Sequence, residues 1–166
     1  MTAEGLLMFG KKLHTPEYTL AGDEVAVIET SQGTIRVRLD GEGAPIHVAN
    51  FCELSTMGFY DGLKFHRYVP GFVIQGGCPN TRDMTRDEVA RGLEGPDGMP
   101  GTGGPGYCIK AEYLTNPNNS HEDGALAMAR SMNPDSAGSQ FYFCLGPQHN
   151  LDSGYTVFGS TIEGKD

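Results

Sequence analysis

The stretch FHRYVPGFVIQGG, residues 65–77, combines a strand pattern with polar side chains that an apolar strand does not need. Short apolar segments lie on both sides of Pro70-Gly71, which favours two neighbouring strands or one bent strand. Arg67 and Gln75 both stand among apolar residues. Because buried polar groups are costly unless they are paired, we expect these two side chains to share one groove.

The sequence on both sides of this stretch predicts short apolar strands separated by glycine-rich turns. The predicted strands are residues 25–29, 34–39, 65–69, 72–76, 107–111, 125–129, 141–145 and 156–159. Ser31-Gln32-Gly33 between the first two predicts a β-hairpin. Many short strands with few helices favour a mainly β fold, a closed or nearly closed antiparallel barrel.

Two helices are predicted. Pro45 suits the first turn of a helix, and apolar residues follow at three- and four-residue spacing until Gly58 can end it. We expect this helix to cover one end of the barrel. Residues 79–100 are dominated by charged residues, and Thr85-Arg86-Asp87-Glu88 forms a capping box that predicts a short surface helix. We interpret residues 79–100 as an insertion, a solvated loop with a short helix.

The length of 166 residues favours one domain with one hydrophobic core. Residues 1–22 lack clear periodicity and hold a proline and several glycines, so they are interpreted as an N-terminal extension that lies on the domain or is partly disordered. The domain itself is assigned to residues 23–166.

Charge and cysteine usage exclude several classes of protein. A net charge of -9 argues against nucleic acid as a partner, because duplex binding depends on clustered Lys and Arg. The four cysteines form no CxxC pair, so we expect free thiols, no metal site and no cofactor. In the first 13 residues the basic side chains follow the apolar run, the reverse of a signal peptide, and no stretch has membrane-spanning length. These observations predict a cytoplasmic protein without a membrane segment.

The string GTGGPG, residues 101–106, matches GxGxxG literally. A dinucleotide site needs a strand before this motif and a helix opening within it, whereas Pro105 and a strand-like segment follow here. We therefore interpret it as a tight loop that exposes its backbone.

Four segments in order resemble the cyclophilin family of peptidyl-prolyl isomerases. They are FHRYVPGFVIQGG, MAR (residues 128–130), AGSQFYF (137–143) and LDSGYTVFG (151–159). The hairpin ETSQGTIRVRL, the helix start APIHVANF and the approach YDGLKFHR resemble the family pattern too. The resemblance runs from Val25 to Glu163-Gly164 and so spans most of the chain.

The resemblance implies an eight-stranded antiparallel β-barrel with a helix capping each end and a proline-binding groove on its outer face. Family members usually continue past the position of Asp166 with a second capping helix and a closing strand, both absent from this sequence. The barrel is then cut short at its C-terminal end. Alternatively, residues 1–22 or a second copy cover the exposed edge.

The resemblance also implies the site. Arg67 matches the family's catalytic arginine, and the remaining matched groove positions are Phe72, Val73, Gln75, Ala129, Gln140, Tyr142, Leu151 and Tyr155. Tyr142 falls at an aromatic position, and Tyr155 replaces a histidine that many members carry. Asn150 stands where the members most sensitive to cyclosporin have tryptophan, which predicts weak cyclosporin binding. The implied partners are Pro-containing peptides and unfolded or folding proteins.

The chemistry follows from the peptide bond itself. Rotation is resisted by partial double-bond character, with a barrier of roughly 18–20 kcal/mol. As the bond twists, the prolyl nitrogen gains a lone pair that a fixed donor such as Arg67 can stabilise, without an acid, base or nucleophile. This predicts a prolyl isomerase acting in protein folding. A non-catalytic module that binds Pro-containing segments through the same groove is the alternative.

Two subsidiary predictions concern residues beside the groove. His66 alternates to the opposite strand face and is expected to make a structural hydrogen bond. Through its junction with Gly101–Gly104, the insertion is the candidate for biasing which residues before proline are accepted. Its plainer interpretation is a solvated loop without that role.

Overall fold

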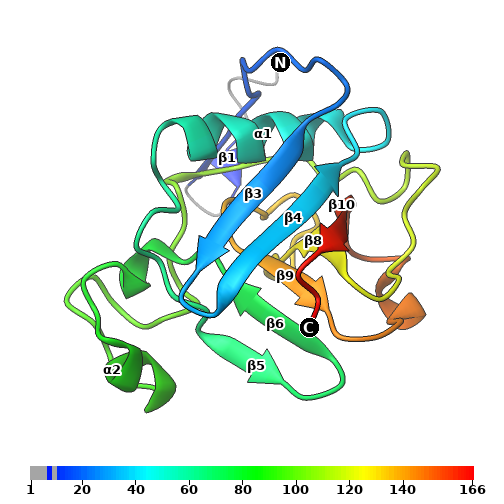
Figure 1. Cartoon of the computed structure of the whole chain (residues 1–166). Coiled ribbons are helices and arrows are strands. Elements are labelled where there is room, and N and C mark those ends of the chain that lie inside the picture. Colours follow the sequence, from blue (N-terminus) through cyan, green and yellow to red (C-terminus); the bar gives the residue numbers. More distant parts are fainter. Residues whose placement is uncertain (1–6, 9–10) are drawn as a thin grey trace.

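The computed structural model of the chain describes residues 7–8 and 11–166, and its main feature is a curled antiparallel sheet of seven strands (Figure 1). In spatial order they are β3 (Val25–Thr30), β4 (Gly33–Leu39), β10 (Val157–Glu163), β8 (Ala125–Met128), β9 (Phe141–Cys144), β6 (Val73–Gly76) and β5 (Arg67–Val69). The predicted mainly β, antiparallel class is confirmed. The sheet is a half-barrel rather than a closed eight-stranded barrel, because β3 and β5 each pair on one side only within the described residues.

The hairpin β3–β4 forms where the alternating pattern predicts it. Thr30 and Gly33 are its last paired residues, and Gly33 has a φ of +141°, which its missing side chain permits. The Thr30 hydroxyl donates to the Gly33 carbonyl at 2.7 Å and accepts from the Gln32 amide at 3.1 Å. The turn therefore sets the register of the two strands that begin the sheet.

Helix α1 (Pro45–Thr56) starts at the predicted proline and lies across the concave side of the sheet (Figure 1). Ala44 before it offers no side chain to cap the helix. The Glu112 carboxylate does so instead, accepting from the Ile46 amide at 3.1 Å and from the His47 amide at 2.8 Å. The His47 ring donates from Nδ1 to the same carboxylate at 2.6 Å. Glu112 is thus a buried cap from a loop far along the chain.

Both faces of the central strands are covered. In β8 and β9 every residue is buried, and successive side chains belong to different clusters. Leu126, Met128, Phe141 and Phe143 join the main core beneath α1. The residues between them point to the opposite face, where a second and smaller cluster forms. This second cluster is the floor of the candidate site.

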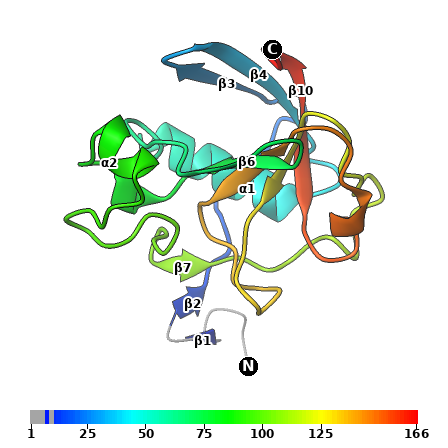
Figure 2. The same cartoon turned by 90° about the horizontal axis from the view of Figure 1, so that it is seen from below.

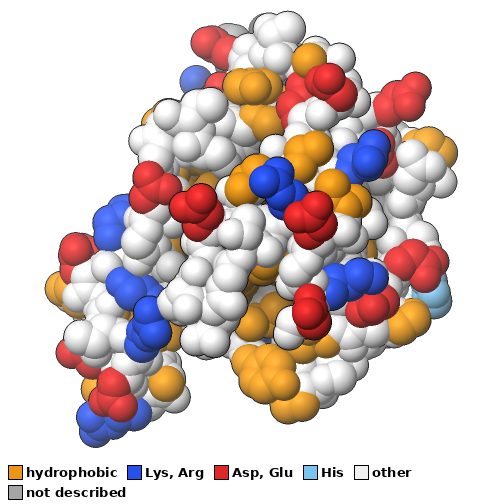
Figure 3. Space-filling model, viewed as in Figure 1, with side chains coloured by type: hydrophobic (Ala, Val, Ile, Leu, Met, Phe, Trp, Pro, Cys, Tyr) orange, Lys and Arg blue, Asp and Glu red, His pale blue; other side chains and the backbone are white. Residues whose placement is uncertain are grey.

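The open side of the half-barrel is hollow. A concavity of about 1490 Å³ lies between the β3–β4 hairpin, α1 and the approach to β5. Val25, Val27 and Tyr68 leave 42%, 49% and 65% of their surface exposed around it. Figure 3 shows exposed hydrophobic side chains scattered among charged ones on this face. The hollow lies between the two ends of the sheet, β3 on one side and β5 on the other.

A small second sheet ties the N-terminal segment to the domain (Figure 2). It contains β1 (Leu7–Met8), β2 (Lys11–Leu13) and β7 (Tyr107–Cys108). Strand β2 runs parallel to β7, with Lys12 opposite Tyr107. Of the strand predicted at residues 107–111, only Tyr107–Cys108 forms, and it belongs to this sheet and not to the barrel, because its partner is the N-terminal segment. Ile109 makes an isolated bridge to Ala137. The described part of residues 1–22 pairs with β7 and leaves the outer edges of β3 and β5 uncovered.

The segment of residues 79–100, which the sequence predicts to be an insertion, is anchored at its base. Its helix α2 (Arg86–Ala90) begins with the predicted capping box, in which Thr85 and Glu88 bond to one another's backbone amides. At the base, the Asn80 side chain donates to the Met99 carbonyl at 3.0 Å, beside the short 3-10 helix η2 (Pro79–Thr81). The helical prediction is confirmed, and the loop is held at both ends rather than free.

The four cysteines are free, as the sequence predicts, and all four are buried. None of the helices in the described part of the chain has the length and apolar character needed to cross a membrane.

Candidate active site

The second cluster gathers predicted site residues from four separate parts of the chain. Strands β6 and β9 pair with Gln75 opposite Tyr142, and β8 places Ala127 on the other side of Tyr142. The predicted site residues in this cluster are Phe72, Val73, Ala129, Tyr142, Leu151 and Tyr155. Val73 and Tyr142 are buried, while the other four are partly exposed, so the cluster presents an apolar surface at the candidate groove.

A chain of amide side chains runs along one edge of this groove. The Arg67 guanidinium donates from Nη1 to Gln75 Oε1 at 3.4 Å, across the register pair of β5 and β6. Gln75 Nε2 donates to Gln140 Oε1 at 3.0 Å. Gln140 Nε2 in turn donates to the carbonyls of Gly101 and Gly103, at 2.9 and 2.8 Å. The glycine loop thus exposes its backbone as predicted, and its carbonyls orient the two amides.

Arg67 itself is exposed, which differs from the expectation of a polar group in a buried slot. The reason is that β5 is the outermost strand and pairs only with β6 within the described residues. The ion pairs of the described residues do not include Arg67. Its charge is therefore held beside the groove by a neutral amide and remains available to a ligand.

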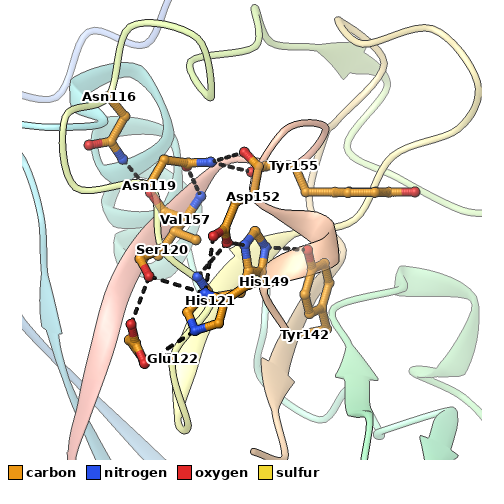
Figure 4. Close-up of polar contacts among 10 residues, drawn as sticks. All are labelled: Asn116, Asn119, Ser120, His121, Glu122, Tyr142, His149, Asp152, Tyr155 and Val157. Carbon is orange, nitrogen blue, oxygen red and sulfur yellow. Dashed lines mark hydrogen bonds and ion pairs between the residues drawn. The ribbon is translucent and has the colours of Figure 1, made fainter. Parts of the chain in front are cut away.

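Behind the groove floor, the Tyr142 hydroxyl is bound to the buried His121, which is paired with the half-buried Asp152 (Figure 4). His121 Nδ1 donates to Asp152 Oδ1 at 2.7 Å, so its Nε2 is the acceptor for the Tyr142 hydroxyl at 2.9 Å. Asp152 also accepts from the His121 backbone amide at 2.7 Å and from the His149 ring at 3.1 Å. These bonds fix the orientation of the Tyr142 ring.

Burial sets the direction of the pKa shifts of Tyr142 and His121, and hydrogen bonds set that of Asp152. Desolvation raises the pKa of Tyr142, so its hydroxyl stays protonated. Burial favours a raised pKa for Asp152 as well, but hydrogen bonds from the His121 amide and ring outweigh it and lower the pKa. The His121 side chain is fully buried, and desolvation lowers its pKa despite the neighbouring carboxylate. The stable form of the cluster is therefore a neutral imidazole between a phenol and a carboxylate.

Mild acid should destabilise the protein through His121. Its folded pKa lies below the ordinary value of 6.5, so the unfolded state binds more protons as the pH falls through that value. The melting temperature is expected to drop between about pH 7.5 and about pH 5.5. In His121→Gln the drop should be smaller, whereas His149→Gln, which removes an exposed histidine, should keep it. Equal pH dependence in wild type and His121→Gln would contradict this assignment.

The loop that carries Leu151 and Tyr155 is held by Asn119 (Figure 4). Asn119 Nδ2 donates to the carbonyls of Asp152 and Tyr155, at 2.7 and 2.9 Å, and its Oδ1 accepts from the Val157 amide at 2.8 Å. The sequence offers no local signal for this contact, because Asn119 lies in a polar loop far from residue 155.

Arg130 is a groove residue that the sequence prediction left without a role. Its guanidinium carbon lies 4.6 Å from the centre of the Tyr155 ring, and its Nε donates to the Gly154 carbonyl at 2.7 Å. Tyr155 meets Tyr142 edge to face, with ring centres 6.1 Å apart. The MAR motif contained a signal for this role, because it places Arg130 next to the predicted groove residue Ala129. A cation in that position is expected to bind a nearby carbonyl or aromatic ring.

The prediction of a structural hydrogen bond for His66 is wrong. Nδ1 and Nε2 of the His66 ring are both buried, and neither has a hydrogen-bond partner. The backbone groups of the neighbouring Gly101 bond to other residues instead of to His66. The Gly101 amide donates to Cys78 Sγ, and its carbonyl accepts from Gln140. Desolvation lowers the pKa of His66, with a smaller opposing contribution from the Gln140 side chain.

No group of three His, Cys, Asp or Glu side chains in the described residues is arranged to hold a metal ion.

Comparison with known proteins places these features in context. The family model for "Cyclophilin type peptidyl-prolyl cis-trans isomerase/CLD" matches residues 25–166. A peptidyl-prolyl cis-trans isomerase of Synechococcus elongatus is 45% identical over 136 residues, which cover 82% of this chain and 79% of that protein. Peptidyl-prolyl cis-trans isomerase B of Bacillus subtilis is 46% identical over 130 residues, covering 78% of this chain and 77% of the relative.

Among solved structures, a cyclophilin-type peptidyl-prolyl cis-trans isomerase of Cryptosporidium parvum, crystallised in the presence of the dipeptide Ala-Pro, is similar in fold. Its TM-score is 0.68 at 28% sequence identity, and the match covers 85% of this chain and 80% of that one.

Proposed function

The chain belongs to the cyclophilin-type peptidyl-prolyl cis-trans isomerase family, and we propose that it isomerises Xaa-Pro bonds in the groove between Arg67 and the apolar cluster. One observation carries the proposal: the Arg67–Gln75–Gln140 chain borders the cluster that contains Phe72, Tyr142 and Leu151. A charged donor and an apolar floor are thus combined in one groove.

In this proposal the apolar cluster holds the proline ring. Phe72, Leu151 and Tyr155 are partly buried and can lose their remaining exposed surface to the ring, which is the main source of affinity for an apolar group. Val73 and Tyr142 form the closed floor. Because Tyr142 is fixed through His121 and Asp152, the floor is in place before the peptide binds.

Arg67 acts on the bond that rotates. As the amide twists, the prolyl nitrogen loses conjugation and gains a lone pair, so a guanidinium donor binds the twisted state more strongly than the planar one. Gln75 holds the guanidinium from one side, and Gln75 is held by Gln140. The donor therefore needs little reorganisation when the bond twists.

Gln75, Gln140 and the backbone at Ala129 hold the peptide on the other side of the bond. The Ala129 amide donates to the Gln140 carbonyl at 2.9 Å, which fixes that part of the wall. One side of the bond is then held while the other rotates, and no acid, base, nucleophile or cofactor takes part.

The proposed partners are Pro-containing peptides and folding proteins. The Cryptosporidium parvum relative, whose structure was determined in the presence of Ala-Pro, supports a proline-containing ligand. Weak cyclosporin binding, which rests on the exposed Asn150 next to Leu151, stays a prediction of the sequence, as does the cytoplasmic location.

The test is the rate of exchange between the cis and trans forms of a short peptide with one Ala-Pro bond, measured by exchange NMR spectroscopy. The wild-type chain is expected to raise this rate well above the rate of the peptide alone. If the peptide binds and its exchange rate stays at background, the protein is the non-catalytic binding module instead.

A further inference from the structure

A small pocket adjoins the groove on the side of Gln75 and Gln140. It has a volume of about 190 Å³ and shares Gln75, Ala129 and Gln140 with the groove. The glycine loop of residues 101–104 and the segment of residues 136–139 form much of the remaining wall. A peptide held with its proline on the apolar cluster would therefore place a neighbouring side chain at this pocket.

The N-terminal extension contributes a cation to the pocket wall. Lys11 is the first residue of β2, and the parallel pairing of β2 with β7 brings it beside Tyr107 and the glycine loop. Its Nζ lies 3.8 Å from the point where a β-carbon on Gly104 would stand. Lys12, the next residue, is not part of the wall, because successive side chains in a strand point to opposite sides.

The pocket is basic although the protein is acidic. Its wall contains two cations, Lys11 and Arg130, and no Asp or Glu. Neither cation takes part in the ion pairs found among the described residues. Arg130 is bound to the carbonyls of Gly154 and Ser131, which orient it without cancelling its charge. The chain has a net charge of -9, so two cations outside any ion pair make the electrostatic potential at this pocket opposite in sign to the protein's net charge.

We infer that this pocket selects an acidic side chain among the residues that precede the proline of the substrate. The inference rests on the proposed function and adds a substrate preference to it. Among unmodified side chains, carboxylates are the groups that a lysine ammonium and an arginine guanidinium recognise together. Lys11 lies outside residues 25–166, the part that matches the family model, so this preference belongs to the chain's own extension.

The experiment uses the full 166-residue chain and matched peptides. Each pair of peptides contains one Ala-Pro bond and differs only by Glu or Gln at the second or third residue before the proline. The readout is the ratio of kcat/KM for the Glu peptide to that for the Gln peptide, from exchange NMR spectroscopy. The proteins compared are wild type, Lys11→Gln, Lys11→Glu and the neighbouring control Lys12→Gln.

At one of the two positions the wild-type ratio is expected to be about threefold at low salt and to approach one as screening increases. Lys11→Gln should lower the ratio, Lys11→Glu should bring it below one, and Lys12→Gln should leave it as in wild type. A ratio near one at both positions in an active wild-type enzyme, or a ratio that Lys11→Glu does not change, would overturn the inference. If neither peptide is isomerised above background, the proposed function fails instead, so the two failures are distinguishable.

Discussion

Replacing Arg67 with alanine is expected to lower kcat/KM for Xaa-Pro isomerisation by about 10²–10³-fold, the usual cost of removing one transition-state donor. The fold should persist, because Arg67 is exposed and its side chain makes one long hydrogen bond, to Gln75 at 3.4 Å. The free energy of unfolding is expected to change by no more than about 0.5 kcal/mol. Exchange NMR spectroscopy of an Ala-Pro peptide and urea denaturation of the same samples measure the two quantities.

Two further variants test whether the loss of activity is specific to the guanidinium group of Arg67. Arg38→Ala removes an exposed arginine from β4, outside the groove, and should keep wild-type activity. Arg67→Lys keeps the charge but loses the planar guanidinium that Gln75 holds, so its activity should lie between those of wild type and Arg67→Ala. A folded Arg67→Ala protein with wild-type kcat/KM would remove Arg67 from the mechanism.

Replacing Glu112 with alanine is expected to destabilise the protein by about 3 kcal/mol, as when one partner of a buried charged network is removed. The carboxylate is 5% exposed and binds the His47 ring and two amides in the first turn of α1. Its loss leaves these donors buried without an acceptor. Urea denaturation, monitored by far-UV circular dichroism, measures the effect.

Two control variants separate the loss of the helix cap at Glu112 from the loss of a negative charge. Glu112→Gln keeps one acceptor oxygen and should be destabilised less than Glu112→Ala. Glu122→Ala removes a carboxylate that is 64% exposed, and its free energy of unfolding should be close to that of wild type. A loss below about 1 kcal/mol in Glu112→Ala would mean that water or another group caps the helix in its place.

The sequence predicted the strands and helices well because their signals are local. The alternation on both sides of Ser31-Gln32-Gly33, the proline at residue 45 and the capping box at Thr85 each depend on neighbouring residues, and each is found in the structure. The strand predicted at residues 107–111 shows the limit of such signals. A short apolar segment indicates a strand, but not which sheet it joins.

The sequence predicted which residues gather at the candidate site better than it predicted how they are arranged. The family resemblance named nine residues, and six of them share the second apolar cluster while the other three, Arg67, Gln75 and Gln140, form its polar edge. His121, Asn119 and Arg130 were missed as site residues. Each acts through a partner more than 20 residues away in the chain, such as His121 with Tyr142 and Arg130 with Gly154.

The sequence by itself determined the mainly β class and the family and predicted the residues of the groove, because periodicity and ordered motifs are properties of the chain alone. The family resemblance already predicted a shortened barrel, but only the tertiary structure decided that the described strands form a half-barrel with β3 and β5 at its edges. It alone also decided that Glu112 caps α1 and that Lys11 reaches the pocket beside Gln140. These features depend on contacts between residues distant in the chain. Such contacts are selected by the packing of the whole molecule and leave no local pattern around either partner.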